Sequence, residues 1–479
     1  MNTTYRRLRP LGTLVGFVGL AGLSGVAQAG GFALIEHGAS GLGNAYAGAA
    51  AVSQDGSTVW FNPAGMSQIE GREVVVGVHL LTTNTDWTDQ GTTLGAALGR
   101  GVASGPTTAE AGTTSALPNF YYVAPINERW SYGLSIGAPF GSSTEYDANW
   151  KGRYTTVESG LSVIDINPAL SYKVSDKISL GFGISLQQLD AELGSAVDSG
   201  AACLGLAGRD DTSFTSTDCV NAGLTPGNVN NDGYGEVTGD STAFGFNLGA
   251  LFTPDEKLKI GVAYRHSVDH ELEGDGDFRI PQNLQDVFAS NTSTDPTGQF
   301  LTANFLTDSP VTAEVDLPAM FSVSAAYQAN PKVQLLGDIT WTGWSSLEEI
   351  RVVYDNPVQD DTLSVQEWED VMRYSAGINY THSDKLTLRA GLAFDEEAIP
   401  SAARRTARIP GNDRTWFSVG GGYQVSQRFS FDVGYSLLML DETPIDNSDP
   451  ESEGVGQEIR GTYDSHVHIV GAQLNWSFN

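Results

Sequence analysis

The chain has 479 residues, with 26 lysines and arginines against 57 aspartates and glutamates, and a formal net charge of −31 at pH 7. This charge excludes a basic nucleic-acid binder, and only 2 cysteines exclude a scaffold held together by many disulfides. Length alone would suggest about three domains, but the continuous pattern described below favours one large domain. The acidity indicates an environment of salt or divalent cations more than a particular partner.

The first 29 residues have the features of an export signal. Three arginines precede an uncharged apolar stretch at residues 11–23, and Ala27-Gln28-Ala29 is a small-x-small cleavage site. The arginines are Arg6, Arg7 and Arg9. An uncleaved membrane anchor, the alternative, needs about 18–20 apolar residues, more than this stretch supplies. We therefore expect residues 1–29 to be a signal peptide, and the protein to be exported through the inner membrane of a Gram-negative cell.

Residues 30–70 differ from the rest of the chain. They are rich in Gly, Ala and Ser, and they show no alternation of apolar and polar positions. The segment nevertheless carries bulky apolar side chains, at Phe32, Leu34, Ile35, Trp60 and Phe61. A free periplasmic extension, the alternative, would not need them, whereas a plug inside a barrel would. We expect an N-terminal hatch over residues 30–70.

From residue 71 onward, apolar residues recur at every second position, with small or polar residues between them. Residues 180–186, 429–435 and 470–478 show this alternation, which is typical of strands with one apolar face. Six short turns, each with a basic residue just before the next strand, join pairs of such strands. The turns lie at residues 127–130, 175–178, 255–258, 330–333, 383–386 and 426–429.

Seven longer stretches, rich in Gly, Asp, Thr and Asn, separate these hairpins. They span roughly residues 81–116, 139–162, 193–241, 273–315, 357–368, 396–413 and 442–461. Alternating short turns and long loops are typical of bacterial transmembrane barrels, which have an even number of strands and, being closed, no free edge in lipid. We predict an all-β fold, a 14-stranded antiparallel transmembrane β-barrel over residues 71–479 with seven long extracellular loops. A soluble sandwich or propeller is the alternative.

Several polar groups could carry chemistry, but none follows a specific pattern. Two pairs of histidines, each with a serine and an aspartate nearby, could suggest a hydrolase or a metal site, but no third metal ligand of defined spacing accompanies them, and ordinary polar histidines are the more common explanation. The pairs are His266 with His270 and His466 with His468. We therefore expect no enzymatic activity, no metal and no cofactor. Cys203 and Cys219 lie in one loop of an exported chain, which predicts a structural disulfide.

Carboxylates crowd two of the long loops, at residues 355–370 and 441–458. Such oxygens could coordinate calcium, although neither run has the spacing of an EF-hand. A solvated acidic surface is the more common explanation, and we favour it here. Divalent cations could also bridge such a surface to lipopolysaccharide.

Several blocks of the sequence resemble the FadL/TodX-type outer-membrane channels for long-chain fatty acids and other hydrophobic compounds. Residues 31–48, followed by Phe61-Asn62-Pro63-Ala64-Gly65-Met66, are similar to the hatch of that family and its Asn-Pro-Ala motif. Further blocks follow in family order at residues 123–127, 316–320, 327–346 and 389–410. The resemblance covers nearly all of the mature chain.

The resemblance implies a 14-stranded barrel with a hatch in its lumen and passive uptake of hydrophobic molecules. Such a molecule is captured between the extracellular loops, held in an apolar pocket and released sideways beside a kinked third strand. The implied pocket and hatch residues are Phe32, Leu34, Ile35, Asn62 and Pro63. In this chain we expect the kink at Gly137, Pro139 and Gly141, because proline inside a strand removes a ladder donor and marks bulges. Alternatively, Pro139 only begins a loop.

The polar end of the pocket departs from the family pattern. Members that bind fatty acids can carry a basic residue at the outer end of the fifth strand, yet this chain has no lysine or arginine between Lys177 and Arg209. Recognition of a carboxylate would then depend on charge-assisted bonds from other arginines. The candidates are Arg153, Arg265, Arg404 and Arg405. A second departure is Asn479, which follows Phe478 where an aromatic residue usually ends such a chain.

We therefore predict a passive channel of the Gram-negative outer membrane that takes up long-chain fatty acids or similar hydrophobic molecules. At roughly 0.8 kcal/mol per buried methylene, an acyl chain binds an apolar pocket without specific chemistry. Uncharged aromatic or aliphatic hydrocarbons are an alternative substrate class, and a general porin or an adhesin is an alternative of another class. The expected partners are hydrophobic small molecules, outer-membrane lipids and lipopolysaccharide but no nucleic acid, and we expect a monomer.

Overall fold

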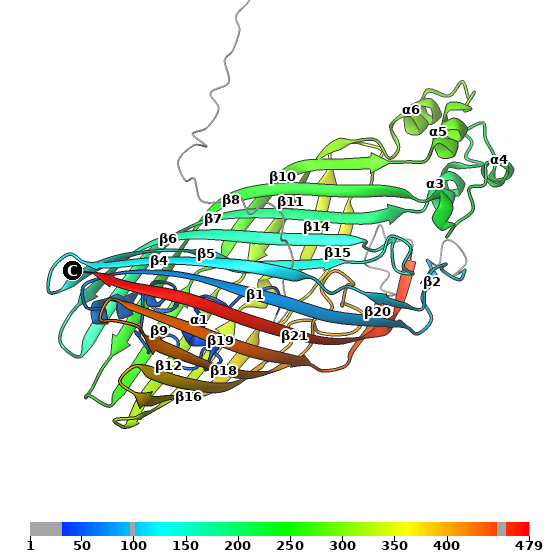
Figure 1. Ribbon diagram of the computed structural model, residues 1–479. Coiled ribbons are helices and arrows are strands. Elements are labelled where there is room, and N and C mark those ends of the chain that lie inside the picture. Colours follow the sequence, from blue (N-terminus) through cyan, green and yellow to red (C-terminus); the bar gives the residue numbers. More distant parts are fainter. Residues whose placement is uncertain (1–30, 96–100, 448–456, 479) are drawn as a thin grey trace, which may run out of the picture.

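A computed structural model describes residues 31–95, 101–447 and 457–478, so the predicted signal peptide lies outside the described residues. The described chain forms a closed antiparallel β-barrel of 14 strands, which confirms the predicted fold class (Figure 1). The barrel closes where the first strand pairs with the last, from Arg72 opposite Phe478 to Asp89 opposite Gly461.

Twelve of the 14 strands are single elements, and two are each built from a broken pair, β9 with β10 and β11 with β12. In order round the wall they are β1 (Arg72–Asp89), β4 (Thr114–Pro125), β5 (Trp130–Glu145), β6 (Glu158–Lys173), β7 (Ile178–Val197), β8 (Gly233–Phe252), β9 (Leu258–Arg265) with β10 (Val268–Arg279), β11 (Ser309–Leu317) with β12 (Met320–Asn330), β13 (Val333–Thr342), β16 (Val371–Ser383), β17 (Leu386–Asp395), β18 (Arg414–Gln424), β19 (Phe429–Leu440) and β21 (Gln457–Phe478). Short additional strands are β2 (Thr93–Leu94), β3 (Thr108–Glu110), β14 (Glu349–Tyr354), β15 (Thr362–Val365) and β20 (Thr443–Asn447).

The two faces of the wall have opposite polarity. An apolar belt of exposed aliphatic and aromatic side chains covers the outer face, and it includes Val78, Ile166, Phe182, Ile339 and Leu474. The side chains between them point inward, and many are buried and polar, among them Asp165, Asn167, Ser185, Gln187 and Gln473. A soluble sandwich buries its apolar face, whereas this wall exposes it, as a barrel surrounded by lipid must.

All six predicted short turns join consecutive wall strands at one end of the barrel, and the long connections lie at the other end (Figure 1). The strands extend further into the predicted loops than the apolar alternation indicated. For example, β7 continues to Val197 and β10 to Arg279. The outward faces of these outer ends carry polar side chains such as Glu273 and Asp275, while apolar side chains such as Leu189 and Leu272 point inward, so the pairing continues where the sequence no longer shows a membrane-facing pattern.

Residues 31–70 lie within the barrel, toward the end with the short turns (Figure 1). This N-terminal segment contains α1 (Ala39–Leu42), α2 (Thr58–Phe61) and the 3₁₀ helix η1 (Pro63–Gln68). The helix α1 contacts β18, β19 and β21, while η1 contacts β6, β7 and β8, so the segment reaches separate parts of the wall.

Asn62 begins η1 and links it to the wall. Its side chain accepts a hydrogen bond from the Ala64 amide at 3.1 Å and donates to the Ala250 carbonyl at 3.0 Å. Two wall glycines make this close approach possible, because a Cβ on Gly181 would overlap the backbone of η1 and a Cβ on Gly249 would overlap Asn62. The Asn-Pro motif therefore works together with glycines that lie far away in the sequence.

Helices also form in the long loops. The helices α3 (Ser199–Leu206) and α4 (Ser216–Asn221), and the 3₁₀ helix η3 (Val229–Asn231), lie between β7 and β8, while α5 (Gln282–Ala289) and α6 (Pro296–Asn304) lie between β10 and β11. The 3₁₀ helix η4 (Trp344–Ser346) follows β13. Cys203 and Cys219 form a disulfide between α3 and α4, within an apolar cluster shared by both loops. None of the described helices is long and apolar enough to cross a membrane.

Candidate functional site

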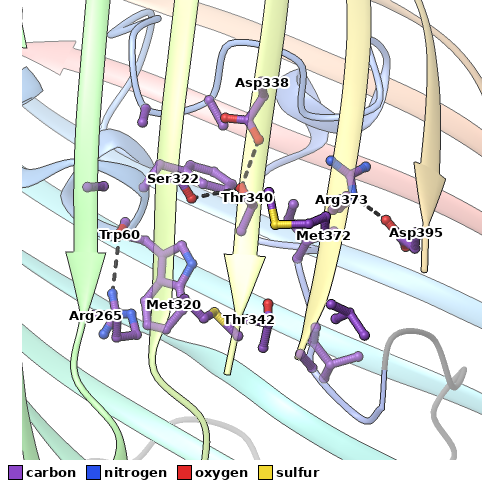
Figure 2. A pocket seen from close by; sticks show the side chains of 18 of the residues that line it. Trp60, Arg265, Met320, Ser322, Asp338, Thr340, Thr342, Met372, Arg373 and Asp395 are labelled. Atoms are coloured by element: carbon purple, nitrogen blue, oxygen red, sulfur yellow. Dashed lines mark hydrogen bonds and ion pairs between the residues drawn. The ribbon is translucent and has the colours of Figure 1, made fainter. Parts of the chain in front are cut away.

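A cavity lies between the N-terminal segment and the outer half of the wall, and it encloses about 1140 Å³ of atom-free space, part of which is open to solvent. Leu34, Ile35, Trp60, Phe61 and Met320 contribute apolar surface to it. Polar wall side chains complete the lining, as Figure 2 shows for Ser322, Asp338, Thr340 and Arg373. An apolar chamber with a few polar groups is the usual composition of a site for an amphipathic small molecule.

One polar group of the lining is a cluster of two arginines around a carboxylate. The Arg373 guanidinium lies 2.8 Å from one Asp395 oxygen, and that of Arg414 lies 2.9 Å from the other. The indole of Trp416 donates to Asp395 at 2.8 Å, and Arg373 also donates to the Ala45 carbonyl of the N-terminal segment at 2.9 Å. Two positive charges thus share one negative charge at the cavity wall, and Figure 2 shows the pair formed by Arg373 and Asp395.

Arg265 forms a second polar group on another strand. Its guanidinium stacks 3.4 Å above the Trp60 ring and donates to the Trp60 carbonyl at 3.2 Å (Figure 2). It also donates to the Ser185 hydroxyl at 3.0 Å, and Asp165 lies 4.0 Å away. Cation–π stacking of this kind fixes the N-terminal segment against the wall.

Glu36 belongs to the N-terminal segment, outside the membrane-spanning strands, and lines the same cavity. It is only 4 % exposed. Burial raises the pKa of its carboxyl group to about 7, although its own backbone amide, Arg414 and Arg373 act in the opposite direction. The carboxyl group therefore changes charge near neutral pH.

The first described residues tie the N-terminal segment to β5. Leu34 donates its amide to the Pro139 carbonyl at 2.8 Å, and the Gly141 amide donates to the Phe32 carbonyl at 2.9 Å. Ala33 and Phe140 lie opposite each other in this short antiparallel bridge. The Phe32 ring is enclosed by aromatic side chains, with the Trp344 centroid at 4.7 Å and the Trp368 centroid at 5.8 Å.

The wall is irregular at the place where this bridge meets β5. The pairing of β5 with β6 shifts register between Gly137 and Phe140, so β5 has a bulge there and Pro139 lies inside the strand. Among the described residues, β4 pairs with β5 only over Phe120–Pro125, which lie opposite Ser131–Ile136 of β5. The outer half of β4 pairs with β1 alone. The bulge therefore adjoins an interruption in the hydrogen bonding of the wall.

The structure brings only part of the sequence-predicted site together. Leu34, Ile35 and Pro63 line the cavity, Phe32 and Asn62 anchor the segment that borders it, and Arg265 is the one candidate arginine in the lining. The other three candidates lie in the outer loops. There Arg153 binds Asp232 at 2.6 Å, Arg404 binds Glu367 at 2.8 Å, and Arg405 binds Glu397. Tyr154 and several carbonyl groups complete the surroundings of Arg153 and point to a structural role.

Sequence reasoning missed Arg373, Arg414 and Glu36. Arg373 and Arg414 each lie near the outer start of a wall strand, at inward-facing positions. Their inward-facing positions could have been found in the sequence from the alternation of the strands. Their contact with Asp395 could not, because it depends on β16, β17 and β18 being neighbours in the wall.

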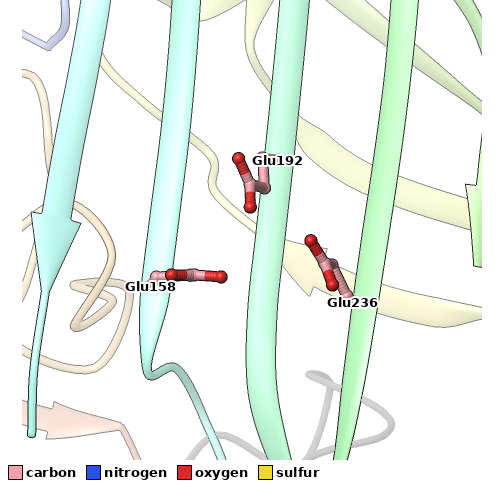
Figure 3. Close-up of side chains that lie close together, drawn as sticks. All are labelled: Glu158, Glu192 and Glu236. Atoms are coloured by element: carbon pink, nitrogen blue, oxygen red, sulfur yellow. The ribbon is translucent and has the colours of Figure 1, made fainter. Parts of the chain in front are cut away.

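Other polar clusters lie away from the cavity. Glu158, Glu192 and Glu236 project from adjacent strands, with carboxylate oxygens within 4.8 Å of one another (Figure 3). They are partly exposed, and Tyr234 and Arg279 already bind two of them at 2.6 and 2.8 Å. Exposed acidic groups commonly lie this close without an ion, and we assign no metal here.

The four histidines of the two sequence-predicted pairs also lie outside the cavity lining. Nδ1 of His468 on β21 lies 2.8 Å from the Tyr435 hydroxyl, and His466 is its neighbour on the same face. His266 lies 3.0 Å from the Tyr264 hydroxyl, and His270 is buried beside Gln187. Each histidine packs against polar or aromatic neighbours.

An apolar outer belt, a polar inner wall and a closed ring of 14 strands define a transmembrane barrel of the bacterial outer-membrane type. The profile of the family described as outer membrane protein transport protein (OMPP1/FadL/TodX) matches residues 20–478. The chain belongs to this family of transporters, and it is a Gram-negative outer-membrane protein.

Relatives match over nearly their whole length. Outer membrane protein P1 of Haemophilus influenzae is 28 % identical over 470 residues, which cover 95 % of this chain and 96 % of the relative. The long-chain fatty acid transport protein of Escherichia coli K12 is 26 % identical over 466 residues, or 96 % and 97 % of the two chains.

Solved structures share the fold. A Pseudomonas aeruginosa FadL homologue superimposes with a TM-score of 0.77 and 24 % identity, over 94 % of this chain and 100 % of the other. The Ralstonia pickettii toluene transporter TbuX gives a TM-score of 0.59 and 18 % identity, over 90 % and 97 % of the two chains.

Proposed function

We propose that this protein is a passive channel for long-chain fatty acids or similar hydrophobic molecules. The outer loops capture the molecule, the cavity holds it, and the N-terminal segment acts as a hatch that controls its sideways release into the membrane. One observation carries the proposal: residues that border the cavity are themselves hydrogen-bonded to the bulge in β5.

The cavity supports the binding step. Its apolar side chains can take up an acyl chain, at roughly 0.8 kcal/mol for each buried methylene, while the arginines offer bonds to a polar end. The aromatic side chains around Phe32 lie on the side of the cavity that faces the loops. They belong to one apolar cluster with loop residues such as Leu347 and Ile399. An apolar molecule therefore meets matching surface from the loops inward.

The wall supports the release step. Residues Phe32–Leu34 separate the cavity from the interruption between β4 and β5, and backbone hydrogen bonds to Pro139 and Gly141 hold them there. When these residues move, the cavity connects with the hydrocarbon region of the membrane. An apolar solute is most stable in that region, so no energy source is needed.

A reversible lock tests the release step. Ala33→Cys together with Phe140→Cys places two thiols on opposed residues of the antiparallel bridge, where a disulfide can form. We expect the oxidised variant to lose uptake of radiolabelled oleate in a Gram-negative strain without its own fatty-acid transporter, and to recover it on reduction. Wild type and each single cysteine, oxidised and reduced, are the controls, since reduction also affects Cys203–Cys219. Undiminished uptake by the fully oxidised variant would refute hatch-controlled release.

Uncharged hydrocarbons remain a second candidate class, because each cavity arginine already faces a carboxylate of the wall. Displacement of a fluorescent fatty acid by palmitate, hexadecane or toluene separates the two classes. Hydrocarbons that displace the probe as well as palmitate does would favour a hydrocarbon port. High ion conductance in planar bilayers would instead favour a general porin, whereas normal uptake after deletion of the gene would favour an adhesin.

The outer surface of the barrel indicates which molecules surround it in the membrane. The apolar belt faces outer-membrane lipids, and the acidic strand ends beyond it lie at the level of lipopolysaccharide head groups. Because β1 and β21 pair along their lengths, the described wall closes on itself and has no terminal strand to offer to a partner strand. We therefore propose that the protein works as a monomer.

A further inference from the structure

Five buried atoms of the cavity cluster have no hydrogen-bond partner among the described residues, and two of them, Nε of Arg373 and Oδ1 of Asp395, face each other as an ion pair at 2.8 Å. The other three are Oε2 of Glu36, Nη1 of Arg373 and Nε of Arg414. The first atom is an acceptor when Glu36 is ionised, and the other two are donors. Leaving such groups unpaired in a buried site is costly, so a polar group of a ligand is the natural partner.

The missing partner must satisfy both kinds of atom. An oxygen that only accepts hydrogen bonds, as in an ester, can serve the arginines but not an ionised Glu36. A carboxylic acid or an alcohol serves both, because it accepts through oxygen and donates through its hydroxyl group. An ionised carboxylate, like an ester, pairs with Glu36 only if Glu36 is protonated and donates, but unlike an ester it also brings a negative charge to the two arginines. Either way, one proton lies between Glu36 and the ligand.

We propose that Glu36 and the head group of the ligand share one proton beside Arg373 and Arg414, and that this pair selects amphiphiles with a carboxyl or hydroxyl end. This inference rests on the proposed function and specifies its substrate class. Two carboxyl groups that share a proton carry one negative charge, which the adjoining arginines stabilise. A fatty acid that arrives ionised takes this proton from the solvent.

Every charged group near Glu36 bears on its protonation. Arg373, Arg414 and Asp395 face it from β16, β18 and β17, and Tyr46 is the neighbouring titratable group of its own segment. Burial is the largest influence and favours the proton, and Asp395 adds to it, while the two arginines oppose it. Above a pH of about 7 the empty site loses this proton, so binding must take one up and weakens as the pH rises.

Calorimetry measures the proton directly. Palmitate is titrated into the full barrel, held in amphipol, at pH 8 in two buffers of different ionisation enthalpy. We expect the wild type to take up close to one proton per palmitate at this pH, and its affinity to fall about fiftyfold from pH 7 to pH 9. Glu36→Gln should take up none and change its affinity less than about twofold over that range. Methyl palmitate should bind the wild type about tenfold more weakly than palmitate, and hexadecanol should not share this loss.

Two further variants control for folding and for charge. Glu70→Gln makes the same change at the exposed end of the N-terminal segment, and it should retain the wild-type proton uptake. Glu36→Asp keeps the carboxyl group, and it should restore proton uptake if Glu36→Gln folds poorly. Binding of palmitate without proton uptake, or equal binding of the methyl ester, would overturn the inference but leave the channel intact. Failure of palmitate, hexadecanol and hexadecane alike to bind the wild type would overturn the proposed function itself.

Discussion

At the scale of single residues, the packing of the N-terminal segment against the wall depends on positions where the wall has no side chain. Gly181 is an example, because a Cβ there would overlap the backbone of Pro63 and Ala64, which cannot shift as a flexible side chain could. Glycine is therefore required for packing at this position, even though it weakens a strand in general.

We predict that Gly181→Val leaves the barrel folded but dislodges η1 from the wall. The expected result is a clear rise in single-channel conductance in planar bilayers, since the N-terminal segment no longer fills the lumen. Gly421→Val is a matched control, because a Cβ there meets its neighbours only at ordinary contact distances of 3.4 Å or more. Equal conductance of the two variants would show that docking of η1 does not close the lumen.

At the scale of elements, the sequence predicted the wall better than the site. The six turns were predictable because alternation on both sides and a polar turn are local properties. The outer strand ends were not, because residues such as Asp275 and Glu273 lie beyond the lipid, where no apolar face is required. Arg373 and Arg414 were missed for a different reason: their common partner, Asp395, is determined by which strands are neighbours.

Two of the long loops share an apolar cluster, in which α3 and α4 pack with α5 around the disulfide. We predict that replacing Cys203 and Cys219 together by serine weakens this loop cluster and not the barrel. A closed loop of this length is typically stabilised by about 3 kcal/mol, so hydrogen exchange over residues 199–224 should become much faster. Mass spectrometry measures that exchange, and the melting temperature of the wall should stay unchanged. A large fall in that temperature would instead mean that the loops help to hold the barrel.

At the scale of the whole molecule, the acidic residues are concentrated on one part of the outer surface. Beyond the apolar belt, carboxylates of neighbouring strands lie directly opposite one another. The opposed pairs are Asp269 with Asp316, Glu271 with Glu314, Glu273 with Asp240, Asp277 with Glu236 and Asp190 with Asp240. Like charges in such positions destabilise a sheet, so this part of the barrel depends on ions in the surrounding solution.

We predict that the melting temperature rises by a few degrees when NaCl is increased from 10 to 500 mM, because salt screens these repulsions. MgCl₂ at the same ionic strength should act similarly, and chelation by EDTA should have no effect once NaCl is present. Replacing Glu271 and Glu273 by glutamine should raise the melting temperature in low salt and reduce its dependence on salt. If micromolar Mg²⁺ stabilised the wild type where NaCl did not, the surface would bind divalent cations specifically, and screening alone would no longer explain how the protein tolerates its charge.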